Sequence, residues 1–172
     1  MTGVQTCALP IWDEPLIPSE NIDLVIKPLL DSGDLSASTL MIAIHSWSEM
    51  LDPNICKVVV DNVGRALYFT RAPLPYNRDH RCVDKSKVDN EEGANQMIFG
   101  YKHIGVYAYR KSFLLKFSNM KTSRLENTEK LEQLRFLENG YSIQVVETKQ
   151  NSIGVDQPND LDRIIKNMNG GQ

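Results

Sequence analysis

The chain has 172 residues, of which 41% are hydrophobic and 24% are charged, and this composition is typical of one soluble globular domain. Its formal net charge of -3 argues against a broad basic surface, so we expect no nucleic acid among its partners. The longest apolar runs are far shorter than the ~20 residues that cross a bilayer, so we also expect no membrane partner. Three cysteines without metal-ligand spacing indicate reduced thiols and a cytoplasmic location.

Residues 1–12 differ in character from the rest of the chain. The string TGVQTCALPI at 2–11 has neither helical nor strand periodicity, and it resembles the translation of a short-read sequencing adapter. We therefore expect a non-native leader over 1–12 and the domain itself over 13–172. The alternative is a native leader that is loosely ordered.

The first elements of the domain are a helix and a buried strand. Apolar spacing predicts an amphipathic helix that Ser19 caps, that Pro28 kinks or ends, and that Gly33 closes. The apolar run at 39–44 then predicts a strand buried on both faces of a sheet.

A hairpin and a long polar stretch follow. Residues 57–61 and 65–70 alternate like two strands, and Gly64 between them suits the positive φ that tight turns often need. The stretch 73–96 is polar and aperiodic, and its length is typical of a functional loop.

The second half alternates strands and helices. The pattern predicts a strand at 103–109, a helix at 111–118, a strand at 141–148 and a last helix after Asp156. Helices intermixed with strands favour a layered α/β domain.

Between these elements the sequence predicts one continuous helix that ends at Asn139 and Gly140. Its apolar face includes Leu131, Leu134 and Leu137. Glu126 and Lys130 are one turn apart in such a helix and would form a favourable ion pair.

Two aspartates lie where open α/β sheets place ligand-binding residues. Asp13 opens the domain, and Asp156 lies between a predicted strand and a predicted helix. Two carboxylates from distant strands suffice to hold Mg²⁺, which takes its other ligands from water and substrate phosphates. The alternative is that Asp156 caps a helix and that Asp13 is a solvated turn residue.

Arg71 and Arg78 flank the string APLPYN, and two guanidinium groups on one loop suit the bidentate recognition of a carboxylate. The alternative is that both are ordinary surface arginines.

His103 and Tyr107 lie four residues apart on a predicted strand, which places them on one face as a possible hydroxyl-binding pair. A buried histidine with a satisfied hydrogen bond is an equally good interpretation. Glu129, Glu132 and Gln133 fall on adjoining positions of one predicted helix, where such residues usually form a hydrated face.

Five strings in this order resemble one enzyme family. They are DEPLIP at 13–18, NICKVVVDNVGRALYFTRAPLPYNRD at 54–79, KHIGVYAYRKSFL at 102–114, LENTEKLEQLRFLENGYSIQVV at 125–146 and GVDQPNDLDRI at 154–164. The chain thereby resembles the 3-deoxy-manno-octulosonate (KDO) cytidylyltransferases. The resemblance implies the C-terminal part of a three-layer α/β fold with a mixed sheet, the nucleotide-diphospho-sugar transferase-like fold.

The resemblance also implies a reaction. Enzymes of this family transfer a cytidylyl group from CTP to the anomeric hydroxyl of KDO, which gives CMP-KDO and pyrophosphate for lipopolysaccharide biosynthesis. We therefore expect a nucleotidyltransferase with CTP and KDO as substrates, Mg²⁺ as cofactor and a homodimeric assembly.

The family's functional residues carry over to matching positions. Asp13 and Asp156 match the catalytic, metal-binding aspartates. The residues that match the acid-sugar site are Arg71, Arg78, His103, Tyr107, Glu132 and Gln133.

The departures concern the N-terminal side. Ile11 and Trp12 stand where the family has Gln-Gly, and we expect that the family's CTP-binding N-terminal region is missing and that the chain alone is inactive. One alternative is a cytidylyltransferase for another acid sugar, such as a sialic acid. Another is a non-catalytic fragment that binds or dimerises, for example through the 57–70 hairpin. A third is that the carboxylates act only as caps and surface charges.

Overall fold

The computed structural model describes residues 6–8, 17–76, 78 and 98–151. The strands are β1 (Thr6–Ala8), β2 (Ala37–Ile44), β3 (Lys57–Val60), β4 (Ala66–Thr70), β5 (Gly100–Arg110) and β6 (Ile143–Glu147). The helices are α1 (Ser19–Asp31), α2 (Trp47–Leu51), α4 (Lys111–Phe117), α5 (Arg124–Glu129) and α6 (Leu134–Glu138). The strands join in one sheet of order β4-β3-β5-β2-β6, and β1 also pairs with β5.

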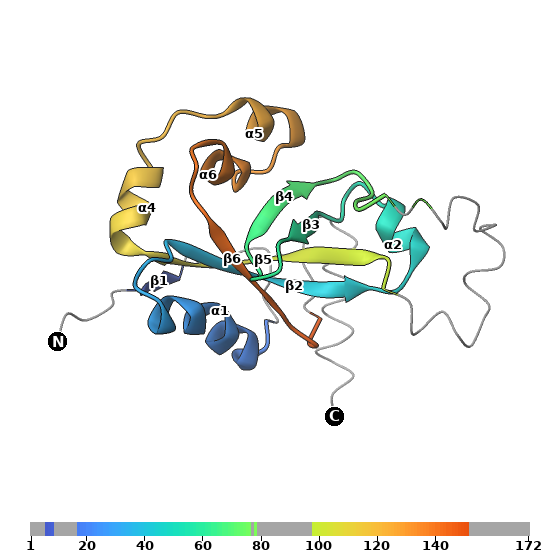
Figure 1. Ribbon diagram of the computed structural model, residues 1–172, viewed down its shortest axis with the longest axis horizontal. Coiled ribbons are helices and arrows are strands. Elements are labelled where there is room, and N and C mark those ends of the chain that lie inside the picture. The colour runs from blue at the N-terminus through green and yellow to red at the C-terminus, as the bar shows by residue number, and fades with distance from the viewer. Residues whose placement is uncertain (1–5, 9–16, 77, 79–97, 152–172) are drawn as a thin grey trace, which may run out of the picture.

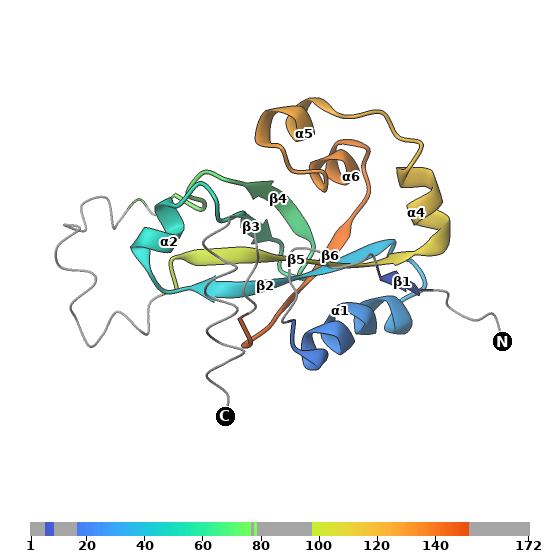
Figure 2. The same ribbon diagram turned by 180° about the vertical axis from the view of Figure 1, so that it is seen from behind.

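The sheet is mixed and has helices on both faces. β2 runs parallel to β6 and antiparallel to β5, and the other pairs are antiparallel. Figures 1 and 2 show α1 on one face of the sheet and α5 and α6 on the other. This arrangement confirms the predicted layered α/β domain with a mixed sheet.

β2 lies inside the sheet, between β5 and β6, and most of its residues are buried. Ala37, Leu40 and Ile44 are fully buried, as the sequence predicts for this run. Leu40 packs with Val25 and Leu29 of α1, so α1 covers one face of the sheet through its apolar stripe.

α1 begins and ends differently from the prediction. Pro18 is the N-cap, and Ser19 is the first helical residue, with its hydroxyl on Glu20 rather than on a backbone N–H. Pro28 lies inside the helix, which continues to Asp31. Proline removes one helical donor, but the buried apolar face holds the last turn in place.

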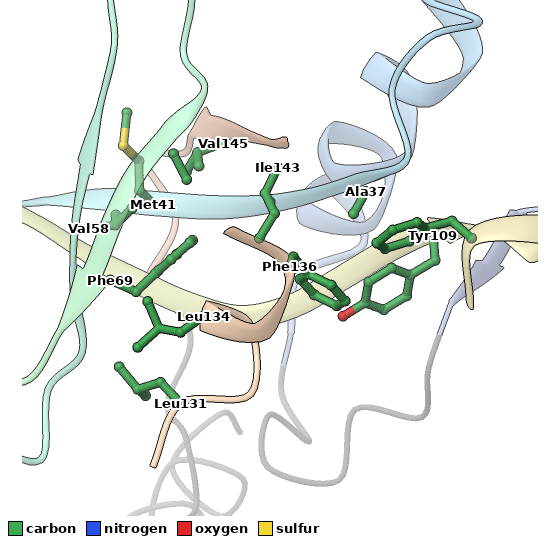
Figure 3. Close-up of a cluster of buried hydrophobic side chains, with 12 residues drawn as sticks. Ala37, Met41, Val58, Phe69, Tyr109, Leu131, Leu134, Phe136, Ile143 and Val145 are labelled. Atoms are coloured by element: carbon green, nitrogen blue, oxygen red, sulfur yellow. The ribbon is translucent and has the colours of Figure 1, made fainter. Parts of the chain in front are cut away.

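The other face of the sheet packs against α6, and the β3–β4 hairpin contributes side chains to the same core. Figure 3 shows Phe69 of β4, Leu134 and Phe136 of α6 and Ile143 of β6 converging on this core, and all four are almost completely buried. The predicted hairpin is thereby confirmed, and it forms one wall of the core.

The hairpin turn reaches across to β6. Gly64 has φ +79°, as predicted, and its carbonyl accepts a 2.8 Å hydrogen bond from the Val145 N–H. The Gln144 side chain donates to the Val63 carbonyl at 2.9 Å. These bonds connect the turn to β6, although β4 and β6 are the first and last strands of the sheet order. The turn and β6 therefore enclose the core.

The prediction of one continuous helix before Asn139 is wrong. The chain forms two short helices because Lys130 takes the left-handed conformation, with φ 58°, and ends α5. Glu126 does not pair with Lys130. It completes a capping box with Ser123 and binds Arg135 of α6 instead, with Oε2 2.7 Å from Nε and Oε1 in contact with Nη2.

The leader also differs from expectation, since Thr6–Ala8 forms β1 although the sequence shows no strand pattern there. β1 pairs antiparallel with the edge of β5, opposite Ala108–Arg110. Pairing of this kind uses backbone groups, so it needs no side-chain pattern. The predicted last helix lies outside the described residues, and no helix within them is long and apolar enough to cross a membrane.

Candidate functional site

An irregularity between β2 and β5 sets the position of the two predicted pocket residues on β5. Thr39 is opposite Tyr107 whereas Leu40 is opposite Ile104, so β5 bulges between these points. The Thr39 hydroxyl lies against the bulge, 2.7 Å from the Val106 carbonyl oxygen. His103 and Tyr107 share one face, as predicted, with ring centroids 5.2 Å apart.

The hydrogen bonds around Thr39 define the tautomer of His103. Thr39 Oγ1 has one proton and lies closest to the Val106 carbonyl, which can only accept. The Nε2 atom of His103, 2.9 Å from the same Oγ1, must then be the donor. Burial lowers the pKa of His103 to about 3, so the ring is neutral and Nδ1 is a hydrogen-bond acceptor.

Tyr107 carries an unsatisfied polar group. Its hydroxyl is buried and makes no hydrogen bond among the described residues, although the Thr39 hydroxyl is nearby. Burial also raises the pKa of Tyr107 well above its usual value, so the hydroxyl keeps its proton. A buried hydroxyl without a partner is costly, and a ligand that supplies one would remove this cost.

Cys56 connects the α5–α6 region with β5. Its carbonyl accepts a 2.8 Å hydrogen bond from the His103 N–H, and its Sγ lies 3.8 Å from Nε2 of Gln133. Glu132 is close enough to raise the pKa values of Tyr107 and Tyr109. Cys56 thus contacts His103 and Gln133, and the charge of the exposed Glu132 acts on Tyr107. We call the five residues His103, Tyr107, Glu132, Gln133 and Cys56 the β5 cluster.

The two arginines differ in their surroundings. Arg71 donates from Nη1 to the carbonyls of Pro53 and Asn54, at 3.1 and 3.3 Å, and from Nε to the carbonyl of Glu129 at 3.1 Å. Among the described residues, no hydrogen bond engages Nη2 of Arg71. Arg78 is exposed, and no contact within the described part of the chain ties it to the β5 cluster.

Asp13 and Asp156 lie outside the described residues, and within residues 17–76 and 98–151 no three potential ligands gather to hold a metal. The segments next to them do meet. The fully buried Asn21 accepts a 2.6 Å hydrogen bond from the Thr148 hydroxyl and donates to the Gln150 carbonyl at 3.1 Å. The start of α1 and the chain after β6 are thereby held together.

Sequence reasoning missed several residues of this region. Thr39, Cys56 and Lys57 belong to strands or their flanks and carry no motif, and Glu129 reads as part of a hydrated helix face. The signal in the sequence is a charged residue in an apolar strand. Lys57 opens the run KVVV, and in the structure it is completely buried.

A mixed sheet with helices on both faces and a polar cluster beside its central antiparallel strand is the fold of nucleotide-diphospho-sugar transferases. A solved CMP:2-keto-3-deoxy-manno-octonic acid synthetase, in complex with CTP, superposes with a TM-score of 0.77 at 33% identity, over 93% of this chain and 60% of that one.

The chain belongs to the cytidylyltransferase family, whose sequence model matches residues 7–147. This match begins inside the leader expected at 1–12. The 3-deoxy-manno-octulosonate cytidylyltransferase of Geotalea uraniireducens is 47% identical over 91% of this chain and 61% of its own length. The enzyme of the same name from Pelobacter propionicus is 50% identical over 87% of this chain and 57% of its own length. The chain therefore spans about six tenths of these relatives.

Proposed function

We propose that this chain carries the acid-sugar half of a cytidylyltransferase that transfers CMP from CTP to KDO for lipopolysaccharide biosynthesis. The observation that carries the proposal is the β5 cluster, in which the buried Tyr107 hydroxyl has no partner within the described residues. The names of the similar enzymes support the choice of CTP and KDO as substrates.

The cluster offers the hydrogen-bonding groups that a polyhydroxylated acid needs. Nδ1 of His103 accepts a hydrogen bond from a sugar hydroxyl, and the Tyr107 hydroxyl donates one. The exposed carboxylate of Glu132 and the amide of Gln133 bind further hydroxyls. We assign the sugar carboxylate to Nη2 of Arg71 and to the guanidinium of Arg78, because planar donor pairs suit a carboxylate.

The reaction places the anomeric hydroxyl of the bound sugar against the α-phosphorus of CTP, and pyrophosphate leaves. Positioning of the two reactants accounts for much of the rate in such a displacement. We propose Asp13 and Asp156 as the ligands of Mg²⁺, since two carboxylates are the donor set that this hard ion takes. When bound, the ion supplies positive charge that neutralises phosphate oxygens. The hydrogen bonds of Asn21 to Thr148 and Gln150 support the pairing, because they join the segments that lead to the two aspartates.

A comparison of two proteins tests this proposal. With CTP, KDO and Mg²⁺, we expect negligible pyrophosphate release by the 172-residue chain and clear release after it is joined to the N-terminal part of the Geotalea enzyme. Asp156→Asn in the joined protein should lose nearly all activity, whereas a cap or surface role predicts an almost unchanged rate. No turnover of KDO by the joined protein would reject the function, and faster turnover of a sialic acid would reassign the substrate.

We also propose that the protein is a homodimer that associates through the β3–β4 hairpin. Val63 and Leu67 of this hairpin are 67% and 60% exposed, and β4 is the outer strand of the described sheet. An apolar outer strand is a surface that proteins usually cover. Sedimentation should show a dimer that Leu67→Lys converts to a monomer, whereas the matched change Leu30→Lys in α1, at 59% exposure, should not affect it.

A further inference from the structure

The carboxylate of Glu129 connects the last turn of α5 with the end of β4. Its Oε1 accepts a 2.7 Å hydrogen bond from the Thr70 hydroxyl, and its Oε2 accepts a 3.0 Å bond from the Arg71 backbone N–H. The Glu129 carbonyl accepts a third bond, from Nε of Arg71. Three hydrogen bonds of this kind determine where α5 ends relative to the sheet.

The same arginine continues into the loop before β3. Nη1 of Arg71 donates to the carbonyls of residues 53 and 54. Nζ of the buried Lys57 donates to those of residues 52 and 55, at 2.6 Å each. Every carbonyl of residues 52–55 therefore accepts a bond from a cationic side chain, and Cys56 of the β5 cluster comes directly after this loop.

The other side of the cluster also depends on Glu129. Lys130 turns the chain in the left-handed conformation immediately after it, and Glu132 and Gln133 follow within four residues. Gln133 is buried with its amide against Cys56. The carboxylate thus lies between the two segments that bring Gln133 and Cys56 together.

We propose that Glu129 is a positioning residue of the acid-sugar site. It touches no substrate, and it acts by holding Arg71 on the 52–55 loop and the 130–133 turn against the β5 cluster. The inference rests on the proposed function, because it needs the cluster to bind the acid sugar.

Glu126 provides a matched control on the same helix. It stabilises α5 through the capping box with Ser123 and through Arg135, and it makes no hydrogen bond to Thr70 or Arg71. A variant at Glu126 should therefore weaken the fold without changing the link between α5 and β4.

The experiment measures the binding of 3-deoxy-manno-octulosonate to the 172-residue chain by calorimetry, together with thermal unfolding. Because charge-assisted hydrogen bonds are lost, we expect Glu129→Ala to raise the Kd about tenfold or more. Glu129→Gln keeps one acceptor oxygen and should fall between wild type and alanine. Glu126→Gln should lower the Tm at least as much as Glu129→Gln while leaving the Kd within about twofold of wild type, since its contacts lie elsewhere.

A second readout does not depend on the ligand. Exchange of the Arg71 backbone amide with solvent should be faster in Glu129→Ala than in Glu126→Gln, because only the former removes its acceptor. If Glu129→Ala fails to fold, Glu129→Gln carries the comparison.

The outcomes separate the two proposals. A wild-type chain that does not bind 3-deoxy-manno-octulosonate rejects the proposed sugar site itself. A wild-type chain that binds it, with equal Kd values for wild type and the Glu129 variants or an equal loss in Glu126→Gln, overturns only the positioning role.

Discussion

At the scale of single residues, three members of the β5 cluster, His103, Tyr107 and Cys56, are neutral side chains in defined protonation states. His103 is neutral because it is buried, and Tyr107 keeps its proton for the same reason. Burial likewise raises the pKa of the Cys56 thiol to about 12, despite the nearby cations Arg71 and Lys57. These three side chains therefore keep the same hydrogen-bond donors and acceptors near neutral pH.

The low pKa of His103 predicts an acid-dependent loss of stability. The pKa is about 3 in the folded state against an ordinary value of 6.5, so below pH 6.5 the unfolded chain takes up a proton that the folded chain does not. The free energy of unfolding should be unaffected by His103 above pH 6.5 and should fall between pH 6.5 and 3, by at most about 1.4 kcal/mol per pH unit.

Urea unfolding of wild type and His103→Gln between pH 5 and 7 measures this effect. Glutamine keeps a donor for Thr39 but does not titrate, so the variant should show a shallower loss of stability toward pH 5. Identical pH dependence in the two proteins would contradict the buried, neutral assignment.

At the scale of elements, the hairpin turn depends on Gly64 for two separate reasons. Its φ is positive, and a Cβ there would lie 2.6 Å from Nε2 of Gln144 and 3.2 Å from the Val145 carbonyl oxygen. Gln144 can move aside only by giving up its hydrogen bond to Val63. Gly140 also has a positive φ, but it has no atom within 4 Å of the added Cβ.

The two glycines allow a matched comparison. Gly140→Ala should cost about 1–2 kcal/mol of unfolding free energy for the left-handed backbone alone. Gly64→Ala should cost about 1 kcal/mol more, because it also loses a hydrogen bond across to β6. Urea unfolding of both variants tests this, and equal losses would mean that the contact between the turn and β6 contributes nothing.

At the scale of the whole molecule, the fully buried Asn21 makes a polar contact between two layers of the fold. It joins α1 to the chain after β6, 127 residues away from it at Thr148. Both side chains are almost completely buried, so each one needs the other as a partner.

A double-mutant cycle measures this connection. Asn21→Leu leaves the Thr148 hydroxyl without an acceptor for its proton and the Gln150 carbonyl without its donor, and we expect a loss of about 2 kcal/mol or more. Thr148→Val should also destabilise, because it leaves Oδ1 of Asn21 without its donor. The double variant should lose at least about 1 kcal/mol less than the sum, because neither the Thr148 hydroxyl nor Oδ1 of Asn21 then remains unpaired. Additive losses in urea unfolding would show that the two side chains do not interact.

Sequence patterns predicted those elements whose cause is local. The apolar run of β2, the alternation of β5 and the glycine turn of the β3–β4 hairpin depend on neighbouring residues, and all three predictions are confirmed. The prediction of one continuous helix is wrong because it relied on a local pair between Glu126 and Lys130. In the structure Glu126 binds Arg135 instead, and Lys130 ends α5.

For the candidate site, the resemblance supplied His103, Tyr107, Glu132 and Gln133, and their ligand roles stay predictions. In the structure His103 and Tyr107 lie side by side, and Gln133 contacts Cys56. It could not supply Thr39, which contacts His103 beside the bulge of β5, or Cys56, which joins the cluster from the loop before β3. The ligand roles of Arg71, Arg78, Asp13 and Asp156 stay predictions.

The order of residues along the chain thus sufficed for the α/β class, most of the element positions and the family. Periodicity and turn chemistry act over a few residues, so they can be read without knowing what packs where. Only the folded structure shows the protonation state of His103, the unpaired Tyr107 hydroxyl and the hydrogen bonds between Glu129 and Arg71. Each of them arises from burial or from contacts between residues far apart in the chain, and those exist only once the layers have come together.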